Sequence, residues 1–188
     1  MNELDQAIYG FMQRQIHVLF PSKAALASLR CGVGRSMGER PDLLGLVLPD
    51  TELSEYKRQE MQIERALYTA LTLYAFHQQG NDDCVSQGTK EEEAVSHKNS
   101  FGYAVRKLAG KTANKEGVLR RFDQVLTAND LTELAVHARA LISMMRQNKI
   151  SFDYSGFAVA LYHFQQPGGK KQVVLTWGKD FYMHRKEE

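Results

Sequence analysis

The stretch DLTELAVHARALISMMRQ, residues 130–147, gives the clearest indication of the fold class. Its first four residues, Asp130 to Glu133, have the form of a capping box, in which two side chains bond the free amides of the first helical turn. Apolar side chains then recur at helical spacing: Leu131, Leu134, Ala138, Leu141, Ile142 and Met145. The stretch therefore predicts an amphipathic helix with one buried face.

The segments on both sides of this stretch repeat the pattern. We expect further helices from Leu4 to Leu19, over KAALASLR after a Ser22 cap, over about 54–78, over FGYAVRKLAG after a Ser100 cap, over about 115–126, and after an Asp153 cap. In the 54–78 helix, Met61 is expected on the same inward face as Leu67 and Tyr74. Nearly the whole chain is thus predicted to be helical.

The segment VVLTW, residues 173–177, suits either a strand or a helix. We favour a helix because nothing nearby offers a strand partner. The residues that share one helical face are Val173, Val174, Trp177 and Phe181. The predicted fold class is all-α, a compact helical bundle of two packed halves. One domain is expected over 1–188, with possible subdomains 1–80 and 99–188 joined by an acidic exposed loop, 81–98.

Two cysteines without a CxxC motif argue against a disulfide framework or a four-thiolate zinc site and fit a reducing compartment. The amino-terminal residues do not resemble a signal peptide, and no apolar run reaches the roughly 18 residues that a membrane span needs. We therefore expect a cytoplasmic protein without a membrane partner.

The net charge is +2, but the charges are segregated along the chain. Eight basic residues lie between Lys98 and Lys149, opposed only by Glu116, Asp123, Asp130 and Glu133. Five of the basic residues fall on the polar sides of their helices: Lys107, Lys111, Arg120, Arg121 and Arg146. From the pattern alone, these residues form either a solvated helix face or a nucleic-acid-binding face.

No pattern of residues indicates catalysis. The motif GVGRSMG, residues 32–38, follows a helix and has the wrong spacing for a dinucleotide fingerprint, so we interpret it as a glycine-rich turn. Its neighbours Arg30, Arg35 and Arg40 are expected to be poorly paired. Asp82, Asp83 and Glu91 to Glu93 form a solvated charge run rather than the metal site of a nuclease. We expect no enzyme activity, no metal and no cofactor.

Five segments of the chain, in order, resemble the CasB family, the small subunit of the type I-E CRISPR Cascade surveillance complex. They are AALASLRCGVGRSMGERPDL, LYTALTLYAFHQQG, SFGYAVRKLAG, the long run from LRRFDQVL to ALYHF, and VVLTWGKDFY. The set covers most of residues 24–182. The resemblance implies an all-helical, non-catalytic protein that occurs as two copies beside the backbone and large subunits. It further implies contacts with the R-loop of guide RNA and target DNA and with the displaced single strand.

Carried over position by position, the resemblance adds Arg30 and Arg35 in the glycine-rich turn, Arg106 beside Lys107, and Lys179 after the tryptophan. The turn can serve phosphate contact or helix packing. Cys31, Val174 and Thr176 stand where the family often has basic residues, so Trp177 and Phe181 are interpreted as core anchors. The candidate nucleic-acid-binding residues are Arg30, Arg35, Arg106, Lys107, Lys111, Arg120, Arg121, Arg146 and Lys179. The alternative is a purely architectural subunit that bridges other Cascade proteins without touching nucleic acid.

Overall fold

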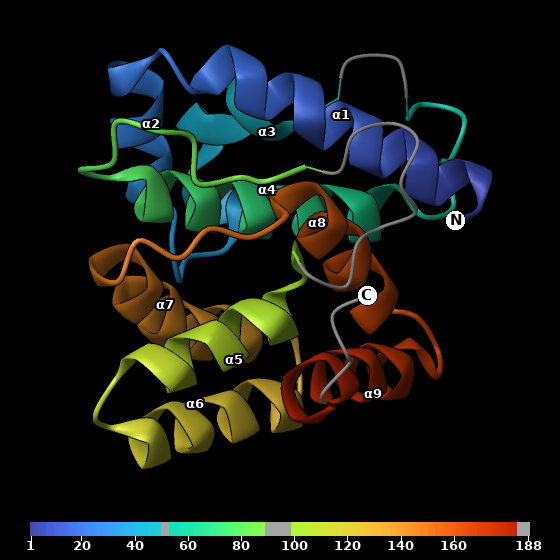
Figure 1. The fold of residues 1–188 in the computed structure, drawn as a ribbon. Helices are drawn as coiled ribbons and strands as arrows, with labels where there is room; N and C mark the ends of the chain where they lie inside the picture. Colours follow the sequence, from blue (N-terminus) through green and yellow to red (C-terminus); the bar gives the residue numbers. More distant parts are fainter. Residues whose placement is uncertain (50–52, 89–98, 184–188) are drawn as a thin grey trace.

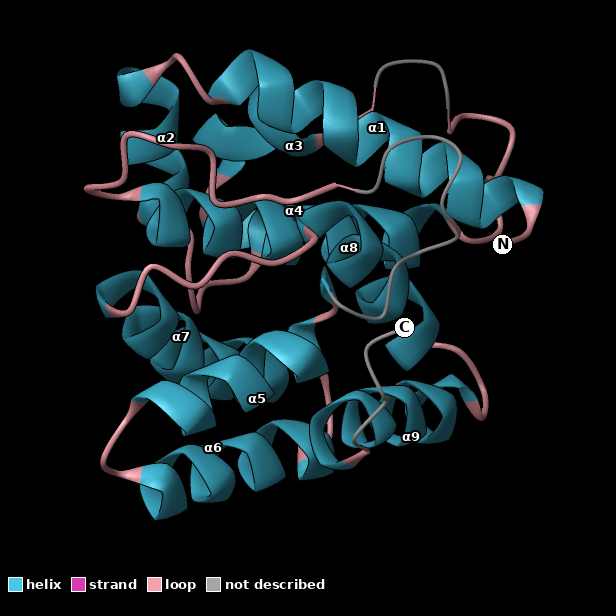
Figure 2. Ribbon diagram, in the orientation of Figure 1, coloured by secondary structure: helices cyan, strands magenta, loops and turns pink. Residues whose placement is uncertain are grey.

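The computed structural model describes residues 1–49, 53–88 and 99–183. Within these ranges the regular structure is helical, and no strand is present beyond one isolated β-bridge (Figure 2). The elements are α1 (Glu3–Leu19), α2 (Lys23–Arg30), the 3-10 helices η1 (Met37–Glu39) and η2 (Pro41–Leu43), α3 (Leu44–Val47), α4 (Glu60–Gln78), α5 (Phe101–Lys111), α6 (Lys115–Thr127), α7 (Leu131–Gln147), α8 (Tyr154–Phe164) and α9 (Gly169–Tyr182). The predicted all-α fold class is confirmed.

The helices are arranged around α4 and α8 (Figure 1). Helices α1 and α2 pack on α4, and α7 packs on another side of α4. Helix α8 lies against α1 and α4 and also contacts α9, while α5, α6 and α9 lie together in the lower part of the view. The buried apolar side chains form one cluster that draws on both ends of the chain. The division into subdomains 1–80 and 99–188 stays a prediction.

Aromatic rings fill the centre of this core. Trp177 is 4% exposed, and its ring lies 5.1 Å from that of Phe101 and 5.6 Å from that of Phe157. Phe181 is 8% exposed and lies 4.9 Å from Phe122. The prediction that Trp177 and Phe181 anchor the core is confirmed, and VVLTW is helical as expected.

Several predicted details were right and others were wrong. Ser22, Ser100 and Asp153 each accept a first-turn amide, as expected of helix caps. The helix predicted over 54–78 begins only at Glu60, since the residues before it form turns. Met61 is 54% exposed, because it lies in the first turn of α4, outside the face that the other helices cover.

The segment predicted as an exposed loop at 81–98 is described only up to Gly88, and Glu91 to Glu93 lie outside the described residues. Its first part is not simply exposed. Val85 is 5% exposed, and its carbonyl accepts the N–H of Phe152 at 3.3 Å. The N–H of Gln87 in turn donates to the carbonyl of Phe152 at 3.0 Å. Pairing with a segment far along the chain therefore fixes residues 85–87 and buries Val85.

Candidate nucleic-acid interface

Helix α5 directs two lysines to solvent. Its buried positions include Phe101, Val105 and Leu108, so the helical period places Lys107 and Lys111 on the opposite face, where both are exposed. The Lys107 ammonium lies 4.9 Å from the centroid of the Tyr103 ring. Partial desolvation, and next the positive charge of Lys111, lower the pKa of Lys107. Two like charges one turn apart repel each other, and a bound anion would relieve this repulsion.

A different face of α5, the one that carries the buried Gly102, packs against α9, and the two helices approach closely there. A Cβ atom on Gly102 would lie 2.3 Å from the carbonyl oxygen of Trp177, so only glycine permits this contact. Further along, Arg106 Nη1 donates to the carbonyl of Met183 at 2.9 Å. The N–H of Met183 bonds the carbonyl of Lys179 at 2.8 Å, which places the exposed Lys179 in the same last turn.

The structure therefore brings four predicted residues onto two adjacent helices. We call Arg106, Lys107, Lys111 and Lys179 the α5–α9 group. Arg106 is held in place by the end of α9, whereas the three lysines project their charges from the exposed faces of their helices.

The two adjacent arginines of α6, Arg120 and Arg121, differ in exposure and in bonding. Arg120 is exposed and forms no ion pair within the described part of the chain. Arg121 is half-buried, and its Nη1 donates to the carbonyl of Gly117 at 2.9 Å, on its own helix. Helix α6 packs against α5 and α7, and Phe122 contacts Phe181 of α9. Arg120 is thus the member of the doublet that faces solvent.

The glycine-rich turn after α2 serves packing directly. A Cβ atom on Gly32 would meet Tyr68 Oη, Leu43 Cδ1 and Thr72 Cγ2 at 2.7–2.9 Å, and Tyr68 Oη donates to the Gly32 carbonyl at 3.1 Å. Gly34 has φ +77°, in the left-handed region that favours glycine. The helix-packing interpretation of this turn is therefore supported by the contacts of Gly32.

The three arginines in and beside this turn differ in their exposure and pairing. Arg35 is exposed and Arg30 is half-buried. Arg40 was expected to be poorly paired, and that prediction is wrong. Its Nε and Nη2 atoms donate to the two carboxylate oxygens of Asp42 at 2.8 and 2.5 Å. A bidentate pair with a residue two positions away occupies the planar guanidinium group.

Arg146 lies apart from the α5–α9 group, against the end of α4. Its Nη1 donates to the carbonyl of Phe76 at 3.3 Å and to Gln79 Oε1 at 3.0 Å. Its Cζ lies 4.8 Å from the Phe76 ring centroid, and Arg139 Cζ lies 5.0 Å from the same centroid. Arg146 thus satisfies the Phe76 carbonyl, one of those that the end of α4 leaves without a helical partner. Arg139 is not among the predicted candidate residues, although its spacing of seven residues from Arg146 puts it on the same face of α7.

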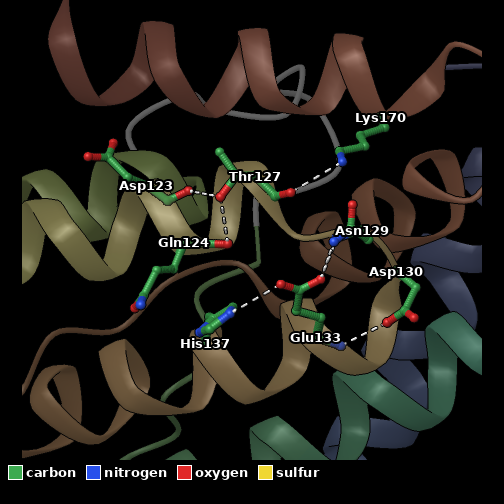
Figure 3. Close-up of polar contacts among 8 residues, drawn as sticks. All are labelled: Asp123, Gln124, Thr127, Asn129, Asp130, Glu133, His137 and Lys170. Carbon is green, nitrogen blue, oxygen red and sulfur yellow. Dashed lines mark hydrogen bonds and ion pairs between the residues drawn. The ribbon is translucent and has the colours of Figure 1, made fainter.

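Two of the carboxylates near the basic helices, those of Asp130 and Glu133, form the cap of α7. At the corner between α6 and α7, the Asp130 carboxylate accepts the N–H of Glu133 at 2.9 Å (Figure 3). Glu133 accepts the backbone N–H of Asn129 at 2.7 Å, so the predicted capping box reaches one residue further back than expected. Bonds from Asn129, and more weakly from His137, lower the pKa of Glu133. These two acids therefore stabilise the corner instead of neutralising the basic residues.

The described residues contain no group of three or more side chains that could hold a metal ion. Asp82 and Asp83 are exposed, and the rest of the acidic run lies outside the described residues. Cys31 is exposed, while Cys84 lies 3.6 Å from Tyr74 Oη. No helix in the described ranges is long and apolar enough to span a membrane.

Comparison with known proteins defines this helical chain as a CRISPR-associated protein. The family described as CRISPR-associated protein Cse2 matches residues 25–182. The chain therefore belongs to the Cse2 family, also named CasB, which is a structural subunit of the type I-E Cascade complex. It is similar to the crystal structure of CasB from Thermobifida fusca, with 28% identity over 94% of this chain and 98% of that chain, and a TM-score of 0.75. No curated protein matches the chain.

Proposed function

We propose that this Cascade subunit is a non-catalytic, nucleic-acid-binding protein that stabilises the R-loop during antiviral DNA interference in the cytoplasm. One observation carries the proposal. Lys107, Lys111, Arg120 and Lys179 are exposed on neighbouring helices, and none of them forms an ion pair with a described carboxylate. Such a set of cations suits the regularly spaced phosphates of a nucleic-acid strand.

The mechanism needs no reading of bases. Guide–target pairing supplies sequence specificity in RNA-guided complexes, and the exchange of DNA duplex for heteroduplex is close to balanced in free energy. A few phosphate contacts from the α5–α9 group and Arg120 can then bias the R-loop toward its open state. The partners in this proposal are the backbone and large subunits, a second copy of the chain, the guide RNA with its target strand, and the displaced single strand.

The nine candidate residues differ in availability. The three lysines of the α5–α9 group, Arg120 and Arg35 are exposed, so we assign phosphate contact to them first. Arg106 and Arg146 already bond carbonyls at the ends of neighbouring helices, and we assign them the support of those ends. Arg121 bonds a carbonyl of its own helix, and we assign it a local role in α6. Arg30 is half-buried beside the packed turn. We assign it a contribution to the positive electrostatic potential that attracts phosphates, without direct contact.

The test uses the complex with a matched control. Replacing Arg120 and Arg121 together by alanine should shorten the R-loop lifetime in reconstituted Cascade, while the subunit keeps its melting temperature. Arg65→Ala is the control, since Arg65 is an exposed helical arginine of α4 outside the candidate set. An unchanged lifetime in the double variant would contradict the proposal.

A second measurement follows binding of the free protein to labelled single-stranded DNA, duplex DNA and single-stranded RNA by fluorescence anisotropy at several salt concentrations. Each phosphate neutralised on a single strand should contribute about −0.7 to the slope of log affinity against log salt. Lys107→Ala and Lys111→Ala should each reduce that slope. Absence of binding at low salt, with an unchanged R-loop lifetime in the Arg120 and Arg121 variant, would favour the architectural alternative.

A further inference from the structure

Tyr182, in the last turn of α9, differs from every other aromatic residue of the chain. All Phe, Tyr and Trp residues lie in the described ranges, and all but Tyr182 are buried or half-buried. Tyr182 is 61% exposed, whereas its neighbour Phe181 is 8% exposed. A large ring held in water gains little from the core, so folding stability does not account for an aromatic residue here.

Among the described residues, one aromatic side chain contacts the ring. Its centroid lies 4.7 Å from that of Phe181 at an interplanar angle of 78°, an edge-to-face contact that does not cover the ring. The Tyr182 hydroxyl forms no hydrogen bond within the described residues. Within the described part of the chain, the ring is therefore supported from one side and otherwise exposed.

The position of the ring is fixed by the junction of α5 and α9. Arg106 Nη1 bonds the carbonyl of Met183, the residue after Tyr182, and the Met183 N–H bonds the carbonyl of Lys179. The close approach at Gly102 holds α9 against α5 one and a half turns earlier. Tyr182 thus stands on an anchored helix end rather than on a free tail.

Two basic side chains lie at the same helix end. Lys179 lies three residues before Tyr182 and is exposed, and the guanidinium of Arg106 bonds the carbonyl of the residue after Tyr182. An exposed ring with cations beside it matches the way proteins bind single strands, in which bases stack on aromatic side chains while basic residues follow the phosphates. A duplex offers no such unstacked base.

We propose that Tyr182 is a base-stacking residue that binds one unpaired nucleotide of a single strand, with Lys179 on the adjoining phosphate and Arg106 as a positioning residue. This proposal rests on the proposed function and adds a selective element to it. Phosphate contact alone does not distinguish a strand with bases from one without them, whereas a stacking residue does.

The experiment compares two single strands of equal length, oligo-dT and the same backbone with abasic sites, against the full-length protein. Tyr182→Ala should weaken binding of oligo-dT by about fivefold or more, as expected for loss of one stacked base, and should leave binding of the abasic strand unchanged. Tyr182→Phe should retain the affinity, because the ring and not the hydroxyl makes the contact.

Leu175→Ala serves as the matched control, since Leu175 is 50% exposed and lies two turns earlier on the same face of α9. It should bind both strands like the unmodified protein. A direct signal is available from Tyr182→Trp, because the natural Trp177 is 4% exposed. Oligo-dT should quench the new tryptophan, and the abasic strand should not.

The outcomes separate this inference from the proposed function. If the unmodified protein binds both strands with the same salt slope and Tyr182→Ala changes neither, the stacking proposal is overturned and phosphate binding stands. An equal loss on both strands also overturns stacking. If the Tyr182→Ala variant binds DNA normally but no longer assembles into Cascade, the ring contacts another subunit and the stacking proposal is overturned. If no strand binds the free protein, stacking and independent DNA binding fail together.

Discussion

Replacing Gly102 by alanine should destabilise the fold, although alanine favours helices. The new Cβ would lie 2.3 Å from the Trp177 carbonyl oxygen and 2.8 Å from the Trp177 Cα. Ordinary contact begins at 3.4 Å, so the backbone of α9 must retreat by about 1 Å. Overpacking of this kind costs roughly 1–3 kcal/mol, and a clash with backbone belongs at the upper end. Alanine returns about 0.5–1 kcal/mol of helix preference, which leaves a net loss of about 2 kcal/mol.

Gly110→Ala is the matched control in the same helix. A Cβ on Gly110 meets nothing within 4 Å, so this variant should gain up to about 1 kcal/mol. The two variants should therefore differ by about 3 kcal/mol in the free energy of unfolding, with the melting temperature moving about 2–4 °C for each kcal/mol.

The assay is urea unfolding followed by circular dichroism, with Trp177 fluorescence as a second probe of the α5–α9 contact. Coincident transitions justify a two-state comparison. If Gly102→Ala proves as stable as Gly110→Ala, the inference that α5 and α9 touch at Gly102 is refuted. The inference that this contact fixes the end of α9 is then refuted as well.

Three further changes test the core and the helix ends. Trp177→Ala should cost about 3–5 kcal/mol in urea unfolding, since the ring is packed against Phe101 and Phe157; an unshifted curve would mean that the ring is not buried. Burial, and next the charge of Arg146, lower the pKa of His77 from 6.5 to about 4. Because the unfolded chain takes up this proton first, stability should fall by about 2 kcal/mol from about pH 7 to pH 5, and His77→Asn should remove that decline. Asp130→Ala should lower stability by about 1 kcal/mol through loss of the α7 cap, and equal stability would show that the cap contributes nothing.

Local patterns predicted the helices well because a helix is specified within a few residues. The caps at Ser22, Ser100 and Asp153 and the inward face of α7 follow from spacing alone. The predicted burial of Met61 and the predicted start of α4 were wrong because both depend on contacts with distant segments. An apolar residue at the correct spacing is buried only if another helix covers that turn, and coverage depends on distant segments.

For the basic residues, too, the sequence predicted the position on the helix or turn but not the bonding partner. Arg121 and Arg146 were predicted on the polar sides of their helices and Arg40 as a poorly paired residue of the turn, but each already bonds a partner in the fold. For Arg146, that partner is the carbonyl of Phe76, seventy positions away. No pattern along the chain reports such a contact.

The sequence by itself determined the helical class, the buried faces and most of the caps, because helical period and capping chemistry act over three or four residues. It also determined the likeness to one protein family, through the order of its motifs along the chain. Only the tertiary structure decided which cations remain exposed, why Gly32 and Gly102 must be glycine, and that Tyr182 alone among the aromatic residues faces solvent. These properties depend on which surfaces of the helices meet, and that is set by the packing of the whole chain.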